Sequence, residues 1–175
     1  MDHEATHDGR GGRLQDEEAA FVHLEELLEA LPLMQEKGAL LASARHAEAV
    51  EQAAEAHDAC TSMLGLAEER LAKAEKALAE ARAFGEGATI DACRREALFA
   101  ASLRGFRVGP ARNAARALDE AVASSPFPDV PSARAARLGR DDLRSLEAEV
   151  DAYRKDYAAT LALCERSGGG SDDAR

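Results

Sequence analysis

The chain has 175 residues and a formal net charge of −11, so it is long enough for one domain with a core and too acidic overall for a general polyanion-binding protein. Alanine accounts for 40 residues, tryptophan is absent and aromatic residues make up 4% of the chain. Such a composition is typical of long helices and excludes a sheet-based fold, because few side chains are available to cover a pleated surface.

The sequence contains no recognisable targeting or membrane-spanning segment. Its first 13 residues are polar and lack the apolar stretch of a signal peptide. The longest uncharged run, residues 59–67, is far shorter than the roughly 20 residues that span a bilayer. We therefore expect a cytoplasmic protein without membrane insertion.

Both ends of the chain are rich in glycine and charged residues. Residues 1–13 and 167–175 are expected to be flexible tails on either side of a single helical domain, residues 14–166. Because the cysteines Cys60, Cys93 and Cys164 are odd in number and widely spaced, neither a disulfide framework nor a thiolate zinc site is expected.

The first helices are predicted from the spacing of apolar residues. Phe21, Leu24, Leu28 and Leu31 follow one another at intervals of three or four, which indicates a helix over residues 14–31. Proline disfavours helical geometry in the residue before it, so the Pro that follows Leu31 predicts a break or a kink. A second helix is expected to begin between residues 33 and 39 and to end near residue 84.

The second helix carries two apolar columns with a period of seven. A repeat of this kind places both columns on one stripe, which predicts a heptad seam packed against another helix. Alanine at every second seam position would let the two backbones approach closely, and we expect the partner helix to be antiparallel. The columns are Leu64, Leu71 and Leu78, and Ala67, Ala74 and Ala81.

The second half of the chain predicts further helices separated by glycine and proline. A heptad repeat returns near the C-terminus, where Leu143, Val150, Tyr157 and Cys164 are spaced by seven. The fold predicted is all-α: an elongated antiparallel helical bundle or coiled coil of about five helices. The remaining expected segments are helices over 90–103, 110–122 and 141–165, a proline-rich loop over 124–131 and a helical turn over 132–138.

Patterns for catalysis or cofactor binding are weak. No glutamate lies three residues before a histidine, as a di-iron bundle requires, and Gly85 and Gly87 lack the lysine of a phosphate-binding loop. Cys60 and Cys164 occupy seam positions, where a buried, unreactive thiol is the usual finding. We therefore predict no metal, no cofactor and no catalytic residue.

The strongest candidate for a binding surface is a run of arginines. Residues 92–140 carry a net charge of +5 and all of their basic residues are arginine, whereas the segments on either side are acidic. Such a run could bind an acidic protein or nucleic acid phosphates, or could pair with the chain's own acidic helices. The candidate residues are Arg94, Arg95, Arg104, Phe106, Arg107, Arg112 and Arg116.

Phe127 is a further candidate, because the prolines on either side of it would hold its ring in a fixed position. The more common reading is that this loop is anchored to the helices by Phe127 and Val130. Taken together, the patterns predict a noncatalytic helical interaction, scaffold or adaptor protein whose partner is a second copy or another helical or acidic protein. The alternative is a nucleic-acid-associated accessory protein that uses the arginines.

Overall fold

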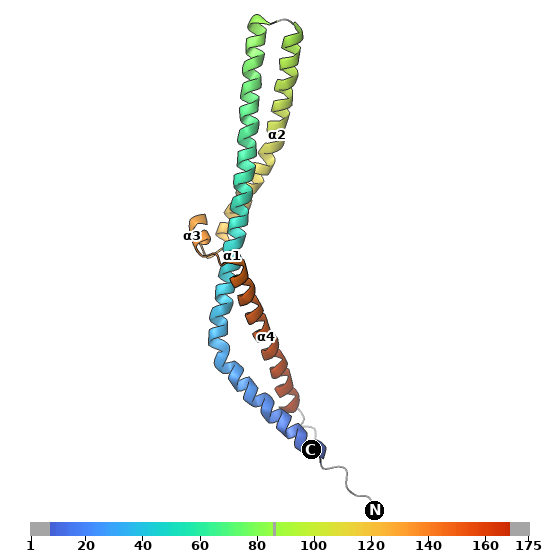
Figure 1. Ribbon diagram of the computed structural model, residues 1–175, viewed down its shortest axis with the longest axis vertical. Helices are drawn as coiled ribbons and strands as arrows, with labels where there is room; N and C mark the ends of the chain where they lie inside the picture. Colours follow the sequence, from blue (N-terminus) through green and yellow to red (C-terminus); the bar gives the residue numbers. More distant parts are fainter. Residues whose placement is uncertain (1–7, 86, 169–175) are drawn as a thin grey trace, which may run out of the picture. The chain divides into compact units, whose positions relative to one another are not determined.

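A computed structural model describes residues 8–85 and 87–168, and every regular element within these ranges is an α-helix. Four helices are present in this part of the chain, where we expected about five (Figure 1). The all-α prediction is confirmed. The helices are α1 (Asp8–Phe84), α2 (Gly87–Ala123), α3 (Val130–Ala135) and α4 (Arg140–Gly168).

Of the break or kink predicted at Pro32, the break is absent, because α1 continues through this residue. A proline in a helix lacks the amide that would bond the carbonyl four residues earlier and its ring crowds that carbonyl, which bends a helix without having to end it. Figure 1 shows α1 bending in the blue to light-blue part that contains this residue. The Tyr153 hydroxyl on α4 donates a 2.7 Å hydrogen bond to the carbonyl of Leu27, one turn before the proline.

The interruption predicted around Gly105 and Gly109 was also wrong, and Pro110 lies inside α2 instead of starting a helix. Both glycines are exposed, and a Cβ atom added at either would meet nothing within 4 Å. Burial of Ala100 and Ala111 on either side of this stretch explains why the helix persists, because packing outweighs the low helix propensity of glycine.

Several predicted boundaries shift. Helix α2 begins at Gly87 instead of residue 90, and α4 ends at Gly168, inside the C-terminal tail that was expected to begin at residue 167. The first helix begins at Asp8, inside the expected N-terminal tail, whereas residues 1–7 and 169–175 lie outside the described ranges. The short helix α3 begins at Val130 instead of residue 132, capped by Asp129, whose carboxylate accepts a 2.8 Å hydrogen bond from the Ser132 amide. This bond lowers the pKa of Asp129. Helix α4 begins one residue before Asp141, the predicted cap.

The contacts divide the chain into two compact units, and the prediction of a single domain stays a prediction. Unit 1 comprises Met1–Ala42 and Leu138–Arg175, so it contains the first part of α1 and all of α4. Unit 2 comprises Ser43–Arg137, with the rest of α1, α2 and α3. Each unit is described by itself below.

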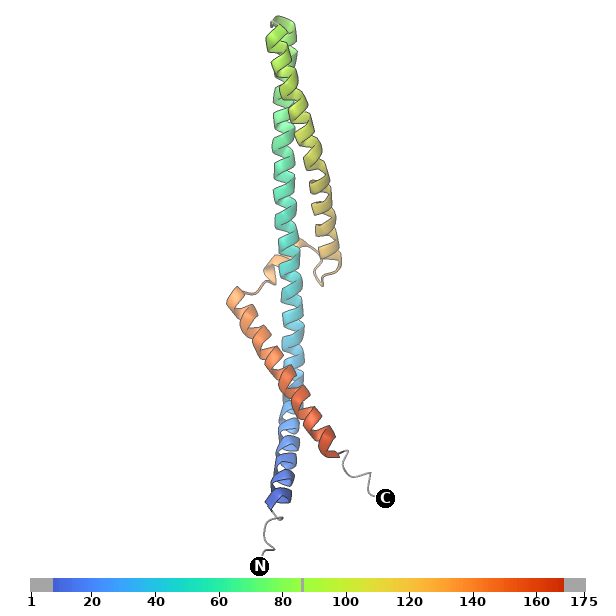
Figure 2. The ribbon, with the colours of Figure 1, turned by 90° about the vertical axis from the view of Figure 1, so that its right-hand side faces the viewer.

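Unit 2 is built on an antiparallel hairpin of α1 and α2, which run side by side from the turn at Gly85 (Figures 1 and 2). Glycine is needed at this turn, because its amide approaches the Ala81 carbonyl to 2.7 Å and a Cβ atom would meet that oxygen at 2.6 Å. The alanine column of the predicted seam is buried and the leucine column half-buried. Small buried side chains let the two helices approach closely.

Helix α3 is held to α1 within unit 2 by a charged cluster that the sequence did not reveal. Glu51, which is 8% exposed, accepts two hydrogen bonds from Arg134 Nε and Nη2 at 2.9 and 3.0 Å. Arg137 lies 3.9 Å from the same carboxylate. The hydrogen bonds from Arg134 lower the pKa of Glu51, so the carboxylate stays ionised where it is covered.

Unit 1 pairs the first part of α1 with α4, which crosses it in the antiparallel sense (Figure 2). An ion pair joins Lys37 to Glu149, and Tyr153 reaches the Leu27 carbonyl further along. Burial raises the pKa of Tyr153, which keeps this hydroxyl protonated as a donor. The four predicted seam residues of α4 are all buried or half-buried: Leu143, Val150, Tyr157 and Cys164. The same holds for Leu146, Tyr153 and Thr160, which lie between them.

The His23 side chain makes unit 1 sensitive to pH. Its Nε2 lies 3.1 Å from both carboxylate oxygens of Asp156 on α4, and its Nδ1 lies 3.3 Å from Glu26. These hydrogen bonds, that to Asp156 foremost, raise the pKa of His23. A raised pKa in the folded state stabilises unit 1 below the unfolded value of about 6.5, and the contribution is lost as the pH rises through the folded pKa.

We therefore expect His23→Gln to destabilise unit 1 below about pH 6 and to have little effect above about pH 8. Urea unfolding followed by tyrosine fluorescence reports on this unit, because both tyrosines of the chain are on α4. His46→Gln is the matched control, since His46 is also an exposed histidine of α1. A His23→Gln effect that does not change with pH would contradict the prediction.

Candidate functional site

The α1–α2 hairpin of unit 2 has a groove along one of its sides. Two adjoining depressions of 270 and 420 Å³ share Leu66 and Arg70 in their walls. We call this surface the hairpin groove. Its walls are formed by Met63, Leu66, Ala67, Glu69, Arg70, Lys73, Ala74 and Ala77 from α1, and by Glu96, Leu103 and Arg107 from α2.

Antiparallel packing explains why these residues meet. In such a pair, the positions that flank the two seams on the same side face each other across the helices. Arg70 and Glu96 occupy such positions, and Arg70 Nη2 lies 2.8 Å from the Glu96 carboxylate. Met63 and Leu103 occupy the equivalent positions about two turns away and line one depression.

Exposed phenylalanines extend the hairpin groove along α2. The Arg70 guanidinium lies 4.7 Å from the ring centroid of Phe99, a cation–π contact that fixes this ring beside the groove. Phe106 lies two turns further along the same side of α2 and is 78% exposed. Met63 and Leu66 are 49% and 64% exposed, so the groove carries apolar side chains without a cover among the described residues.

The hairpin groove is positive as well as apolar. Its walls hold three cations, Arg70, Lys73 and Arg107, against the carboxylates of Glu69 and Glu96. Glu96 is already engaged by Arg70, whereas Lys73 and Arg107 form no ion pair with any residue the structure describes. An apolar floor with a basic edge fits a segment that presents apolar and acidic side chains together.

The predicted arginine cluster is divided by the helix that carries it. Arg107 lines the hairpin groove, and Arg104 is drawn to the opposite side, where Nε lies 3.4 Å from Glu68. Arg94 pairs with Asp91 of its own helix at 3.0 Å. Arg116 Nη2 donates a 2.8 Å hydrogen bond to Oδ1 of the Asn113 side chain. The remaining members are exposed at other positions of α2: Arg95, Arg112 and Arg116.

Helix geometry therefore spreads the arginines over the surface. Arg94 and Arg112 lie on the same side of α2 but are separated by 18 residues, or about 27 Å. Pairing with acidic residues of α1 and α2 also neutralises part of the charge. Of the predicted residues, Arg107 lines the hairpin groove, and Phe106 is its exposed neighbour on α2.

Phe127 is half-buried in the loop between α2 and α3, and its amide donates a 3.2 Å hydrogen bond to the Ser125 hydroxyl. That hydroxyl lies 2.9 Å from the Val122 carbonyl, to which it donates. The Ser125 hydroxyl thus connects the backbone of the loop to the backbone at the end of α2. Val130 is half-buried as well, which agrees with the anchored-loop reading.

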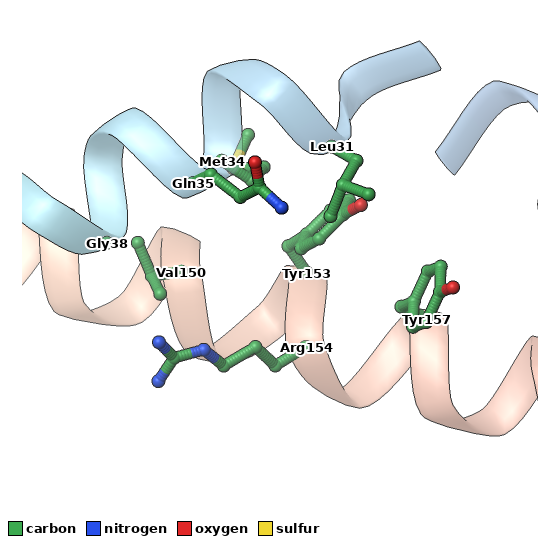
Figure 3. Close-up of a pocket in the computed structure, with 8 residues that line it drawn as sticks. All are labelled: Leu31, Met34, Gln35, Gly38, Val150, Tyr153, Arg154 and Tyr157. Atoms are coloured by element: carbon green, nitrogen blue, oxygen red, sulfur yellow. The ribbon is translucent and has the colours of Figure 1, made fainter. Parts of the chain in front are cut away.

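Unit 1 has a depression of its own, 360 Å³ in volume, between α1 and α4 (Figure 3). Leu31, Met34 and Val150 form apolar walls, and Tyr153 and Tyr157 stand on α4 with ring centroids 6.1 Å apart. Figure 3 shows Tyr153 pointing toward Leu31, on α1. The Tyr153 hydroxyl already donates its hydrogen bond to the Leu27 carbonyl. We therefore interpret this depression as part of the packing between α1 and α4.

Within residues 8–85 and 87–168, no three histidine, cysteine or acidic side chains come together as a metal site would require. None of the helices in this part of the chain has an apolar stretch of the length that crosses a bilayer.

Comparison of the chain with protein-family models, with curated proteins and with solved structures found no match. The assignment of the site therefore depends on the geometry of the chain itself.

The sequence analysis missed most of the hairpin groove. Met63, Leu66 and Arg70 flank the predicted seam at positions that heptad reading usually assigns to solvent. The usable signal was the presence of large apolar residues at those flanking positions in both helices, combined with the expected antiparallel pairing.

Proposed function

We propose that this protein is a noncatalytic helical interaction protein that binds an amphipathic, acidic helix in the hairpin groove. The observation that carries the proposal is the row of exposed apolar side chains beside unpaired cations on one side of the α1–α2 hairpin: Met63, Leu66, Phe99 and Phe106, with Lys73 and Arg107.

The poverty of the buried core supports a role in association. Nine of the buried hydrophobic residues are alanine, and the largest fully buried side chains are Val50 and Val150. A pair of helices with alanine between them buries little apolar area, so a third helix along the groove would add the area that the hairpin lacks.

The finer parts of our prediction belong to this proposal. We infer that the α1–α2 seam packs as a coiled coil and that the protein acts in the cytoplasm through contacts with a second copy or another helical protein. Nucleic acid is the less favoured partner, because α2 distributes its arginines around the helix and several are paired.

A photo-crosslinking residue placed at Phe106 in the native cell tests the proposal. We expect it to capture a protein segment whose apolar residues recur at intervals of three and four and whose net charge is negative, as mapped by mass spectrometry. Leu66→Glu should abolish the capture, because it puts a negative charge in the apolar floor of the hairpin groove, where it would repel an acidic helix.

The matched control places the same crosslinker at Leu98, an equally apolar residue of α2 that is 64% exposed on a different side of the helix. Equal capture at both positions, capture of nucleic acid, or capture that persists in the Leu66→Glu protein would each reject the proposed function. Circular dichroism of each variant verifies that the helices are intact.

A further inference from the structure

The first part of α1 is unusually acidic. Residues 16–36 contain seven aspartate or glutamate residues and no lysine or arginine. All but one of these acids are exposed, and among the described residues of unit 1 the ion pair that involves one of them is His23 with Glu26, at 3.3 Å. This segment therefore presents a concentrated negative charge to its surroundings.

The same segment keeps apolar residues on its outer side. Leu27, which is 8% exposed, and the half-buried Leu24 and Leu31 lie on the side of α1 that packs on α4. Phe21 and Leu28 are 48% and 46% exposed and lie seven residues apart, so they form a stripe on a different side of the helix. The exposed acids beside this stripe are Glu18, Glu25 and Glu29.

We infer that the hairpin groove of one copy binds the acidic outer side of residues 16–36 of a second copy, with Phe21 and Leu28 entering the groove. The inference rests on the proposed function and names its partner. Both surfaces repeat over two helical turns: Phe21 and Leu28 on the segment, Phe99 and Phe106 beside the groove. The exposed acids beside the stripe, Glu25 and Glu29 among them, would bring negative charge to the basic edge of the groove, where Lys73 and Arg107 have no ion-pair partner among the described residues.

Charge decides between this contact and a symmetric one. If two hairpin grooves faced each other, Lys73 and Arg107 would meet the same cations of the other copy, and like charges in a closed contact oppose association. If two acidic segments met, the glutamates would oppose it in the same way. Only the contact between unlike surfaces brings opposite charges together.

A contact between unlike surfaces has a consequence for stoichiometry. Each copy offers one groove and one acidic segment, so after two copies join by one contact, a groove and a segment remain free unless both contacts close between the same two molecules. We expect the weight-average mass to rise with protein concentration and to fall with added salt, because ionic screening weakens the charged part of the contact.

Charge reversal on purified full-length protein tests the inference. One variant carries Glu25→Arg and Glu29→Arg, and the other carries Lys73→Glu and Arg107→Glu. Each variant alone pairs like charges and should self-associate at least about tenfold more weakly than the wild type in sedimentation velocity. An equimolar mixture of the two variants pairs opposite charges again and should regain the association.

A variant with Asp151→Arg and Glu165→Arg is the matched control, because it makes the same change of charge on exposed positions of α4. It should associate as the wild type does. Circular dichroism verifies that all variants are folded, and the mixture provides rescue even where one variant is less stable.

A wild-type protein that stays monomeric at every concentration, or a mixture that fails to regain association, would overturn the inference. Such a result would leave the proposed function standing if the crosslinker at Phe106 still captured an acidic helix from a different protein. Loss of that capture as well would reject both.

Discussion

Val150→Ala should lower the free energy of unfolding of unit 1 by about 2 kcal/mol, through lost burial and the small cavity left behind. Val150 is 1% exposed and, with Val50, is one of the two largest fully buried side chains among the described residues. Val150 lies on α4 and lines the same depression as Leu31 and Met34 of α1. In a unit this poor in large core residues, one valine is a substantial share of the buried apolar area.

The matched control is Val22→Ala, at a helical valine of the same unit that is 52% exposed. Alanine has the higher helix propensity at both sites, so the difference between the two variants isolates the packing contribution. We expect Val22→Ala to change stability by no more than about 0.5 kcal/mol. Urea unfolding followed by the fluorescence of Tyr153 and Tyr157 measures both, and equal effects would show that α4 does not pack on α1 as described.

The sequence predicted the helical class and the seams because both depend on local periodicity. The alanine column at residues 67, 74 and 81 and the α4 column from Leu143 to Cys164 indicate which side of each helix is covered, and those residues are buried or half-buried. Heptad spacing is a property of one helix, so it can be read without knowing the partner.

Helix boundaries were less predictable, because proline and glycine act on the backbone locally whereas packing acts along the whole helix. At Pro32 the local rule predicted a break or a kink without deciding between them, and the helix continues, with contacts of α1 on α4 near the proline that include the Tyr153 hydrogen bond to Leu27. At Pro110 the local rule predicted a helix start, but α2 runs through this residue, and the neighbouring Ala111 is buried.

The candidate site was the least predictable feature. The hairpin groove depends on which flanking residues of α1 meet which residues of α2, and that register is set by the turn at Gly85 and by side-chain packing. The arginine run predicted that α2 has a functional surface, and Arg107 with Phe106 lies there. The partners of this pair, Met63 and Leu66, are some 40 residues earlier in the chain and carry no motif of their own.

Ala100→Leu should destabilise unit 2 by about 1–3 kcal/mol, because it forces three further carbon atoms into a close contact between two helices. Ala100 is 0% exposed and lies on α2 between Glu96 and Leu103, both of which reach across to residues of α1. No large side chain separates the backbones here, so the added volume can be accommodated only if the helices move apart or the leucine adopts an unfavourable rotamer.

Its control is the next residue, Ala101→Leu, which adds the same side chain on an exposed position of α2 and should leave stability within about 0.5 kcal/mol of the wild type. Leucine and alanine have similar helix propensities, so propensity does not explain a difference between the two variants. Thermal unfolding followed by far-ultraviolet circular dichroism compares them. If Ala100→Leu is as stable as Ala101→Leu, close approach across alanine is not what holds the hairpin, and a groove whose walls depend on that approach loses its basis.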